Sequence, residues 1–184
     1  MDDDRRPPTP EPDDRLRRAR HGDEAAFASI YRDHARAIHT LALRLTGSHA
    51  AAEDIVQETF LRMFGFLNGL RDDAPLRPWL KRVAANLAID RLRRERRDRD
   101  WPEGWDPEDE AARAPAQGAE TSGLLRRLPP LARTLVWLHE MEGWSHEELA
   151  RRFRRSPSWS KSILSRALSR LRGELEEERE EGDA

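Results

Sequence analysis

The chain has 184 residues, 37% of them charged, which is enough for one ordinary domain or two small ones. No uncharged stretch exceeds eight residues, which excludes a membrane-spanning helix, and the polar N-terminus lacks the apolar core of a signal peptide. A cytoplasmic location is therefore expected. The absence of cysteine excludes disulfides and thiolate metal sites.

Charge is strongly segregated along the chain, although the formal net charge is only -2. Residues 81–97 carry seven basic and two acidic groups, and residues 151–173 carry eight basic groups and no acidic one. Residues 1–14, 98–120 and 174–184 are acidic, with two basic groups against six, two against eight and one against seven. A polyanion responds to such local patches. The two basic blocks favour nucleic-acid binding over the alternative of solvated helix faces.

The first part of the chain predicts a disordered tail followed by helices. Residues 1–14 are acidic and contain four prolines, which is typical of disorder. Between Asp13 and Ala74 there is no proline, and apolar residues recur at helical spacing. Gly47 is placed to end a first long helix and Ser48 to cap a second. The two apolar stripes are Phe27, Ile30, Tyr31, His34, Ile38, Leu41, Ala42 and Leu45, then Ala52, Ile55, Val56, Phe60, Met63, Phe64 and Leu67.

A third helix and a linker are predicted next. After a loop with Gly69, Pro75 and Pro78, the third helix continues into the basic run that ends near Arg97. Its expected buried residues are Trp79, Leu80, Val83, Ala84 and Leu87. Residues 98–120 have no hydrophobic period and predict a flexible acidic linker. Its Trp101 and Trp105 are expected to dock, either on the chain's own helices or on a partner.

A second helical module is predicted over residues 121–175, with an acidic tail at 176–184. Pro129 and Pro130 suit the start of a helix that Gly143 would end. Residues 145–148 read Ser-His-Glu-Glu, a capping box that opens a short helix, and Ser156-Pro157 is a strong signal for the last helix. The expected buried stripe of that last helix is Leu164, Ala167, Leu168, Leu171 and Leu175.

The order of these elements defines the fold class. A short helix, a tight turn and a longer basic helix form a helix-turn-helix pattern. No segment alternates as a strand would. We therefore expect an all-α chain with two small helical domains.

The sequence lacks the motifs that catalysis would need. There is no glycine-rich phosphate loop. His146-Glu147 begins like a zinc-protease motif, but Ala150 stands where the second ligand would be. We expect a binding protein rather than an enzyme, with no cofactor and no bound metal.

Four segments resemble one family. Residues 52–62, AEDIVQETFLR, resemble the signature helix of bacterial RNA polymerase sigma factors. LALRLTGS, PLRPWLKRVAANLAIDRLRRERR and LPPLARTLVWLHEMEGWSHEELARRF resemble the extracytoplasmic-function (ECF) group of that sigma-70 family. The resemblance covers about 23–97 and 121–175. It implies a region 2 bundle over 15–97 and a region 4 helix-turn-helix over 121–175, in a stress-response factor that initiates transcription at promoters. The implied partners are core RNA polymerase, through its largest-subunit coiled coil and its flap, promoter DNA and an anti-sigma factor.

Helical spacing and the resemblance together nominate a polymerase-binding ridge. On the second helix Asp54, Gln57, Glu58 and Leu61 share the face opposite the buried stripe. Spacing alone would also fit a solvated face. The resemblance implies that this ridge, with Arg62, grips the polymerase coiled coil.

The third helix carries the expected minus-ten site. Arginines suit phosphates, and the Asn86 amide can contact a base edge. The resemblance implies that this helix captures unpaired minus-ten bases, while Trp79 could stack on a base or pack in the core. The expected site comprises Trp79, Asn86, Asp90, Arg91, Arg93, Arg94 and Arg97.

The last helix carries the expected minus-thirty-five site, with departures from the family pattern. Ser160 replaces a buried valine, Ile163 replaces an arginine and Arg154 replaces the turn glycine. We therefore expect phosphate contacts to outweigh base reading here, and Ser160→Val with Ile163→Arg to tighten promoter binding. The nominated residues are Ser158, Trp159, Lys161, Ser162 and Arg166.

Two other classes of protein remain open at this point. One is a stand-alone helix-turn-helix repressor or activator that uses residues 15–97 to dimerise or to sense a signal. The other is an interaction protein such as an anti-sigma decoy, which the altered last helix would allow. A stand-alone regulator would need neither the ridge nor Asn86.

Overall fold

The computed structural model describes residues 14–70, 75–97 and 121–182, and all regular secondary structure in these ranges is helical. The prediction of an all-α chain with two helical parts is confirmed. None of the described helices is long and apolar enough to span a membrane. The predicted disordered tail and the predicted acidic linker, with Trp101 and Trp105, lie outside the described residues.

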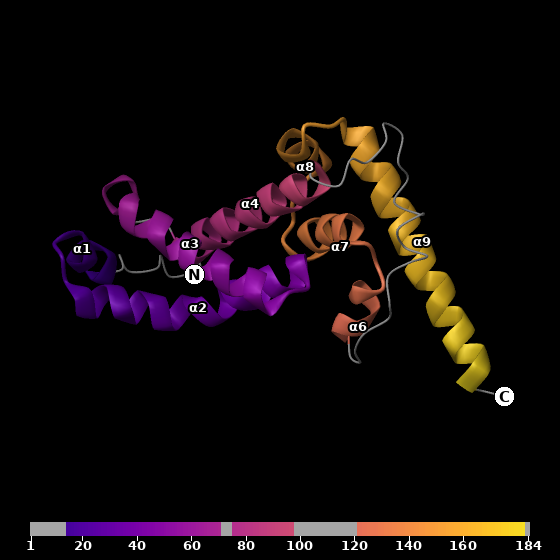
Figure 1. Cartoon of the computed structure of the whole chain (residues 1–184), viewed down its shortest axis with the longest axis horizontal. Coiled ribbons are helices and arrows are strands. Elements are labelled where there is room, and N and C mark those ends of the chain that lie inside the picture. Colours follow the sequence, from indigo (N-terminus) through magenta and orange to yellow (C-terminus); the bar gives the residue numbers. More distant parts are fainter. Residues whose placement is uncertain (1–13, 71–74, 98–120, 183–184) are drawn as a thin grey trace, which may run out of the picture.

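The first half is a helical bundle, drawn from indigo to magenta in Figure 1. Its elements are α1 (Asp14–Arg20), α2 (Glu24–Thr46), α3 (His49–Gly65), the 3-10 turn η1 (Leu67–Gly69) and α4 (Leu76–Arg97). The cap predictions at the α2–α3 junction are confirmed: Gly47 has a φ of 71°, and the Ser48 side chain accepts a hydrogen bond from the backbone N–H of Ala51. At the other end of α2, the Ala26 N–H and then Arg18 hold the pKa of Asp23 below its ordinary value.

The predicted apolar stripes form the core of this half, with two exceptions. Ile38, Leu45, Met63 and Leu80 are fully buried, as expected. Tyr31 and Phe64 were expected in the core but are exposed. The reason is that α2 and α3 bury a narrower stripe than helical spacing alone suggests, and residues at its edges stay in solvent.

The second half is a set of short helices followed by one long helix. Its elements are α6 (Thr121–Arg126), α7 (Pro130–Val136), the π-helical turn η2 (Trp137–Met141), α8 (His146–Phe153) and α9 (Pro157–Gly182). The capping box is confirmed, because Ser145 accepts from the Glu148 N–H and the Glu148 carboxylate accepts from the Ser145 N–H. The Ser156 hydroxyl accepts from the Trp159 N–H at the start of α9, as its cap position predicts.

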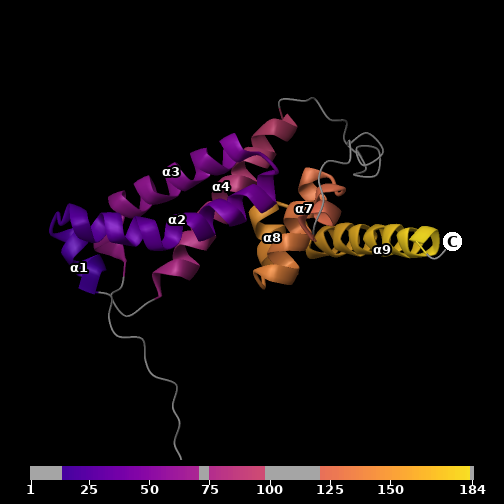
Figure 2. The same cartoon turned by 90° about the horizontal axis from the view of Figure 1, so that it is seen from below.

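Helix α9 extends beyond the predicted module and projects away from the rest of the molecule (Figures 1 and 2). The acidic segment at 176–184 was expected as a tail, yet α9 continues to Gly182. Arg127, which directly follows α6, forms ion pairs with Glu174 (3.5 Å) and Glu178 (2.6 Å), which supports this extension. Leu175, expected in the buried stripe, is exposed because it lies in this projecting part.

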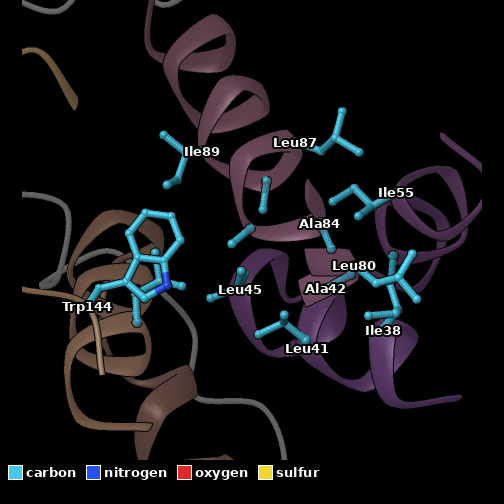
Figure 3. Close-up of a cluster of buried hydrophobic side chains, with 14 of the residues drawn as sticks. Ile38, Leu41, Ala42, Leu45, Ile55, Leu80, Ala84, Leu87, Ile89 and Trp144 are labelled. Atoms are coloured by element: carbon cyan, nitrogen blue, oxygen red, sulfur yellow. The ribbon is translucent and has the colours of Figure 1, made fainter. Parts of the chain in front are cut away.

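The two halves pack directly against each other, which the sequence did not predict. Helix α7 lies against α2 and α4, and α8 lies against α4. The Thr134 hydroxyl donates to the backbone oxygen of Leu45 at 3.1 Å in a buried position. Trp144 belongs to the same buried cluster as Leu45 and Ile89, and Figure 3 shows its ring beside these side chains. One hydrophobic core therefore spans both halves.

Gly47 has a second role at this junction. A Cβ built on Gly47 would lie 2.8 Å from Nη2 of Arg133 in α7, so a larger residue would displace that guanidinium in addition to straining the positive φ. Arg133 is buried, and burial is the main reason that its pKa is lowered. Gly47 thus both ends α2 and lies against the Arg133 side chain of the second half.

Candidate functional site

The ridge on α3 lies on an exposed surface. Asp54 and Gln57 are exposed, and Leu61 is 66% exposed. Glu58 forms an ion pair with Arg62 at 2.9 Å within the helix. Asp54 lies 3.3 Å from Nη1 of Arg91 in α4. The ridge therefore combines carboxylates, one arginine and one apolar side chain that no described part of the chain covers.

Exposed aromatic side chains extend this ridge, and sequence reasoning missed them. Phe64, 63% exposed, meets Phe27 edge-on with ring centroids 5.7 Å apart. Phe66, at the end of α3, is also exposed and stacks parallel to Trp79 with centroids 6.1 Å apart. An off-centre position in the apolar stripe was the available signal for Phe64. Leu61 and Phe64, three residues apart on α3, are neighbouring exposed apolar side chains on the same helix as the carboxylates, a combination typical of a protein-binding surface.

The proposed minus-ten residues on α4 are partly covered. Nη2 of Arg152 in α8 donates to Oδ2 of Asp90 at 2.6 Å and to the backbone oxygen of Asn86 at 3.0 Å. Arg93 also lies beside the Asp90 carboxylate, at 3.7 Å. Arg94 is exposed, and the side chain of Arg97 lies outside the described residues. The expected shared face is therefore present, but the second half occupies its centre.

Trp79 and the basic start of α4 border a cavity of about 550 Å³. Trp79 is half-buried and packs against the core, which agrees with the packing role weighed for it. The cavity lies between the two halves, with Trp79 and Lys81 of α4 on one side and Glu142 and Trp144 on the other. Cations and aromatic rings of this kind could bind phosphates and bases, but here Lys81 and Arg82 already contact Glu142 and Trp144 of the second half.

The side of α9 that is predicted to face DNA matches the prediction in exposure. Ser158, Lys161, Ser162 and Arg166 are all exposed. Trp159 is only half-exposed, because its ring packs on Phe153 of α8 with centroids 5.5 Å apart. This surface offers two long cationic side chains among short hydroxyls.

The two atypical residues of α9 face inward. Ser160 is fully buried and forms a 3.1 Å hydrogen bond with Nδ1 of His146, so the hydroxyl that replaces a valine has a partner. Ile163 is 2% exposed. The expectation that Ile163→Arg would tighten DNA binding is therefore wrong, because the arginine would enter the core instead of facing DNA.

His146 links α8 to α9 and stacks on a second histidine. Its ring lies 4.4 Å from that of His139, centroid to centroid, and Nδ1 of His139 donates to the Trp144 backbone oxygen at 2.7 Å. Burial, followed by the nearby His139 and Lys161, lowers the pKa of His146. The folded helix-turn-helix therefore favours the neutral form of His146.

This geometry defines a class of protein: an all-α chain with an exposed ridge of acidic and apolar side chains on one helix and basic residues on two others. Family comparison identifies the class more closely. Residues 30–98 match the model of Sigma-70 region 2, and residues 120–171 match that of Sigma-70, region 4. The chain belongs to the sigma-70 family and is an ECF RNA polymerase sigma factor.

Individual relatives agree with this assignment. The chain is 36% identical to "ECF RNA polymerase sigma factor SigE" of Mycolicibacterium smegmatis over 70% of this chain, but that match spans only 54% of SigE. It is 31% identical to "RNA polymerase sigma factor CarQ" of Myxococcus xanthus, over 88% of this chain and 97% of CarQ. Among solved structures, the sigma factor RpoE of Bartonella quintana, in complex with the anti-sigma factor NepR, has the same fold. It matches with a TM-score of 0.51 and 23% identity, over 82% of this chain and 96% of that one.

Proposed function

We propose that this chain binds core RNA polymerase through α3 and directs it to promoters through α4 and α9. The observation that carries the proposal is the exposed ridge of Asp54, Glu58 and Leu61 in a chain of this family. Core polymerase is a cytoplasmic enzyme, so the proposed function places the chain in the cytoplasm. The chain itself acts by binding and is assigned no catalytic step.

The ridge is proposed as the polymerase contact. An apolar centre at Leu61 and Phe64 supplies buried area, and the carboxylates of Asp54 and Glu58 supply orientation toward basic groups. The polymerase's largest-subunit coiled coil is the proposed partner here, and its flap is the proposed partner of the second half.

The two basic helices are proposed as the promoter contacts. On α4, Asn86 would hold an unpaired minus-ten base while Arg91, Arg93 and Arg94 neutralise phosphates. On α9, Lys161 and Arg166 would contact phosphates near minus thirty-five, and the exposed serines would reach nearby polar groups. Arg97 and Trp159 are proposed at the edges of these two sites.

A protein regulator is also proposed. A solved structure of the same fold contains a sigma factor together with its anti-sigma factor. We propose that an anti-sigma factor holds this chain inactive by covering surfaces that polymerase or DNA would otherwise bind.

The decisive experiment is transcription with purified core polymerase on fragmented genomic DNA. Promoter-specific transcripts that require the chain would support the proposal, and no transcript from any template would overturn it. The ridge is tested by Asp54→Ala with Glu58→Ala, which should weaken core binding while changing stability by no more than about 0.5 kcal/mol. Glu53→Ala is the matched control, because Glu53 is an exposed carboxylate beside Asp54 on a different face of α3. Equal affinities for all three proteins would show that the ridge is only solvated.

A further inference from the structure

Helix α1 is tied to the turn that follows α3 and leads toward α4. Nε of Arg20 donates to the backbone oxygen of Leu67 at 2.8 Å, and its Nη2 donates to the backbone oxygen of Leu70. One guanidinium therefore bridges the start of the 3-10 turn η1 and the residue after its end. Leu16 of α1 is 2% exposed, so α1 is itself anchored in the core of the first half. The position of the turn thus depends on α1.

The same turn fixes the aromatic ring of Phe66. The Gly69 N–H donates to the backbone oxygen of Phe66 at 2.9 Å, and a Cβ built on Gly69 would overlap the tip of the Phe66 ring. The backbone of the turn therefore passes close to the edge of that ring. The Phe66 ring also stacks on Trp79 of α4, with only 6° between the two ring planes. A shift of the turn would move the ring.

Phe66 differs from the other exposed aromatic residue of α3 in what it contacts. Phe64 meets Phe27 of α2, whereas Phe66 meets Trp79 in the first turns of α4. Phe66 is 52% exposed, and Arg77, two residues before Trp79, is also exposed. Surfaces that bind single-stranded nucleic acid combine exposed rings, on which bases stack, with cations for the phosphates. This end of α4 offers both.

We propose that Phe66 is a stacking surface for an unpaired promoter base and that Arg20 is the positioning residue that holds this surface in place. The inference rests on the proposed function, because it assumes that the chain directs core polymerase to promoters. It adds two residues to those proposed to contact or orient the minus-ten element. Arg20 also precedes residues 30–98, the part that matches the family model. Helix α1 thereby contributes to promoter opening without a DNA contact of its own.

Pre-organisation is the physical reason for a positioning role. A base stacks on one face of a ring, so the ring must have the right position when the base leaves the duplex. If the turn and the ring had to be ordered at that moment, the ordering cost would reduce the gain from stacking. Arg20 and Gly69 remove this cost in advance. The alternative is that Phe66 only shields Trp79, and the two roles predict different results on DNA that lacks a base.

Promoter opening by the chain with saturating core polymerase tests the stacking role. Phe66→Leu removes the ring but keeps an apolar side chain, and it should reduce opening of duplex promoters about tenfold, as expected for one base–aromatic stack. Phe66→Tyr keeps a ring and should open promoters like the parent chain. Templates with single abasic sites through the minus-ten element then identify the base. On one of them the parent chain and Phe66→Leu should open equally well, because the stacked base is absent. No loss on duplex promoters, or the same loss on every abasic template, would overturn the proposal.

Two further variants test the positioning role. Arg20→Met removes the donors but keeps the stem, and Gly69→Ala displaces the Phe66 ring without removing it. Both should reduce opening by up to about tenfold, and both losses should disappear on the same abasic template as the loss of Phe66→Leu. Arg20→Lys keeps a donor and should lose less than Arg20→Met. Arg17→Met, at an exposed position of α1, is the matched control and should behave like the parent chain. Equal losses from Arg20→Met on all templates would make Arg20 merely structural and overturn its assignment.

A control on α3 separates this inference from the proposed function. Phe64→Leu lies on the ridge, so it should weaken binding of core polymerase but should not change opening once polymerase is saturating. Core affinity, which depends on a folded α3, should stay at the parent value for Phe66→Leu and Arg20→Met. A parent chain that yields no promoter-specific transcript would overturn the proposed function and this inference with it. A parent chain that opens promoters no better than Phe66→Leu on any template would overturn this inference alone.

Discussion

The two helices proposed to bind DNA, α4 and α9, differ in what limits them. On α4 the arginines, Asn86 and Asp90 suit base capture, but Arg152 lies across the centre of the face. On α9 the corresponding face is open, but it presents mainly serines with Lys161 and Arg166. Access therefore limits α4, whereas side-chain chemistry limits α9. Substitutions in the core of α9, at Asn86 of α4 and at the residues that join α8 to α9 should separate these two cases.

The largest effect is expected inside α9. Ile163→Arg places a charged side chain at a position that is 2% exposed. Burying an unpaired charge should lower the free energy of unfolding by about 3 kcal/mol or more. Chemical denaturation measures this loss.

Ser162→Arg is the control for that substitution. Ser162 is the exposed neighbour on the proposed DNA face, so the same new arginine should change stability by no more than about 0.5 kcal/mol. It should also strengthen DNA binding by adding one phosphate contact, seen as a salt slope steeper by about 0.9. Equal stability of the two variants would mean that Ile163 does not lie in the core.

On α4, Asn86→Ala should reduce open-complex formation on duplex promoters by about tenfold, which corresponds to about 1.4 kcal/mol for one lost base contact. Arg152 contacts the backbone oxygen of Asn86 and not its side chain, so the packing of α8 on α4 should be unchanged. Permanganate footprinting measures opening. A template melted in advance at minus ten should show a smaller loss; equal losses on both templates would make Asn86 a structural residue.

Sequence patterns predicted the local structure well and the long-range contacts poorly. The caps at Gly47, Ser48 and Ser145 depend on neighbouring residues only, so spacing and residue type were sufficient. Ile163 and Tyr31 were misplaced because their burial depends on which helix covers them. The contact of Arg152 with Asp90 joins residues 62 positions apart, and nothing in either local pattern indicates it.

In the candidate site, too, the features set by local sequence could be predicted and those set by long-range packing could not. Exposure of Asp54, Gln57 and Leu61 could be predicted, since helical spacing sets them opposite the buried stripe. The exposure of Phe64 and Phe66 could not, because an aromatic residue near an apolar stripe is usually buried. Covering of α4 by the second half depends on packing between helices that are distant in sequence.

A substitution in the turn between α8 and α9 should have a smaller effect on stability. Arg154 has a φ of 56°, and among the described residues it is the only non-glycine residue with positive φ. Arg154→Gly should raise the free energy of unfolding by about 1 kcal/mol, because glycine adopts this left-handed conformation without strain. Arg155→Gly removes the same charge at a position without positive φ and should not stabilise. A stabilised Arg155→Gly would show that charge repulsion, not backbone strain, is relieved.

The smallest effect is a pH dependence at the joint of α8 and α9. The pKa of His146 is lowered in the fold, so the unfolded chain binds the proton more readily than the folded chain. The stabilising effect of neutral His146 is therefore complete above the unfolded value near 6.5 and declines as the pH falls through it toward the lower folded value. The 3.1 Å hydrogen bond to buried Ser160 and the stacked ring of His139 are the contacts that protonation of His146 would disturb.

His146→Gln should accordingly lose less thermal stability than the parent chain between pH 7.5 and pH 5.5, even if it is less stable at the higher pH. The difference between the two melting curves isolates His146 from the other five histidines. His49→Gln, at an exposed position in the first half, changes the histidine count equally. If His49→Gln flattened the pH dependence as much as His146→Gln, the effect would come from overall charge. The joint between α8 and α9 would then not be sensitive to pH.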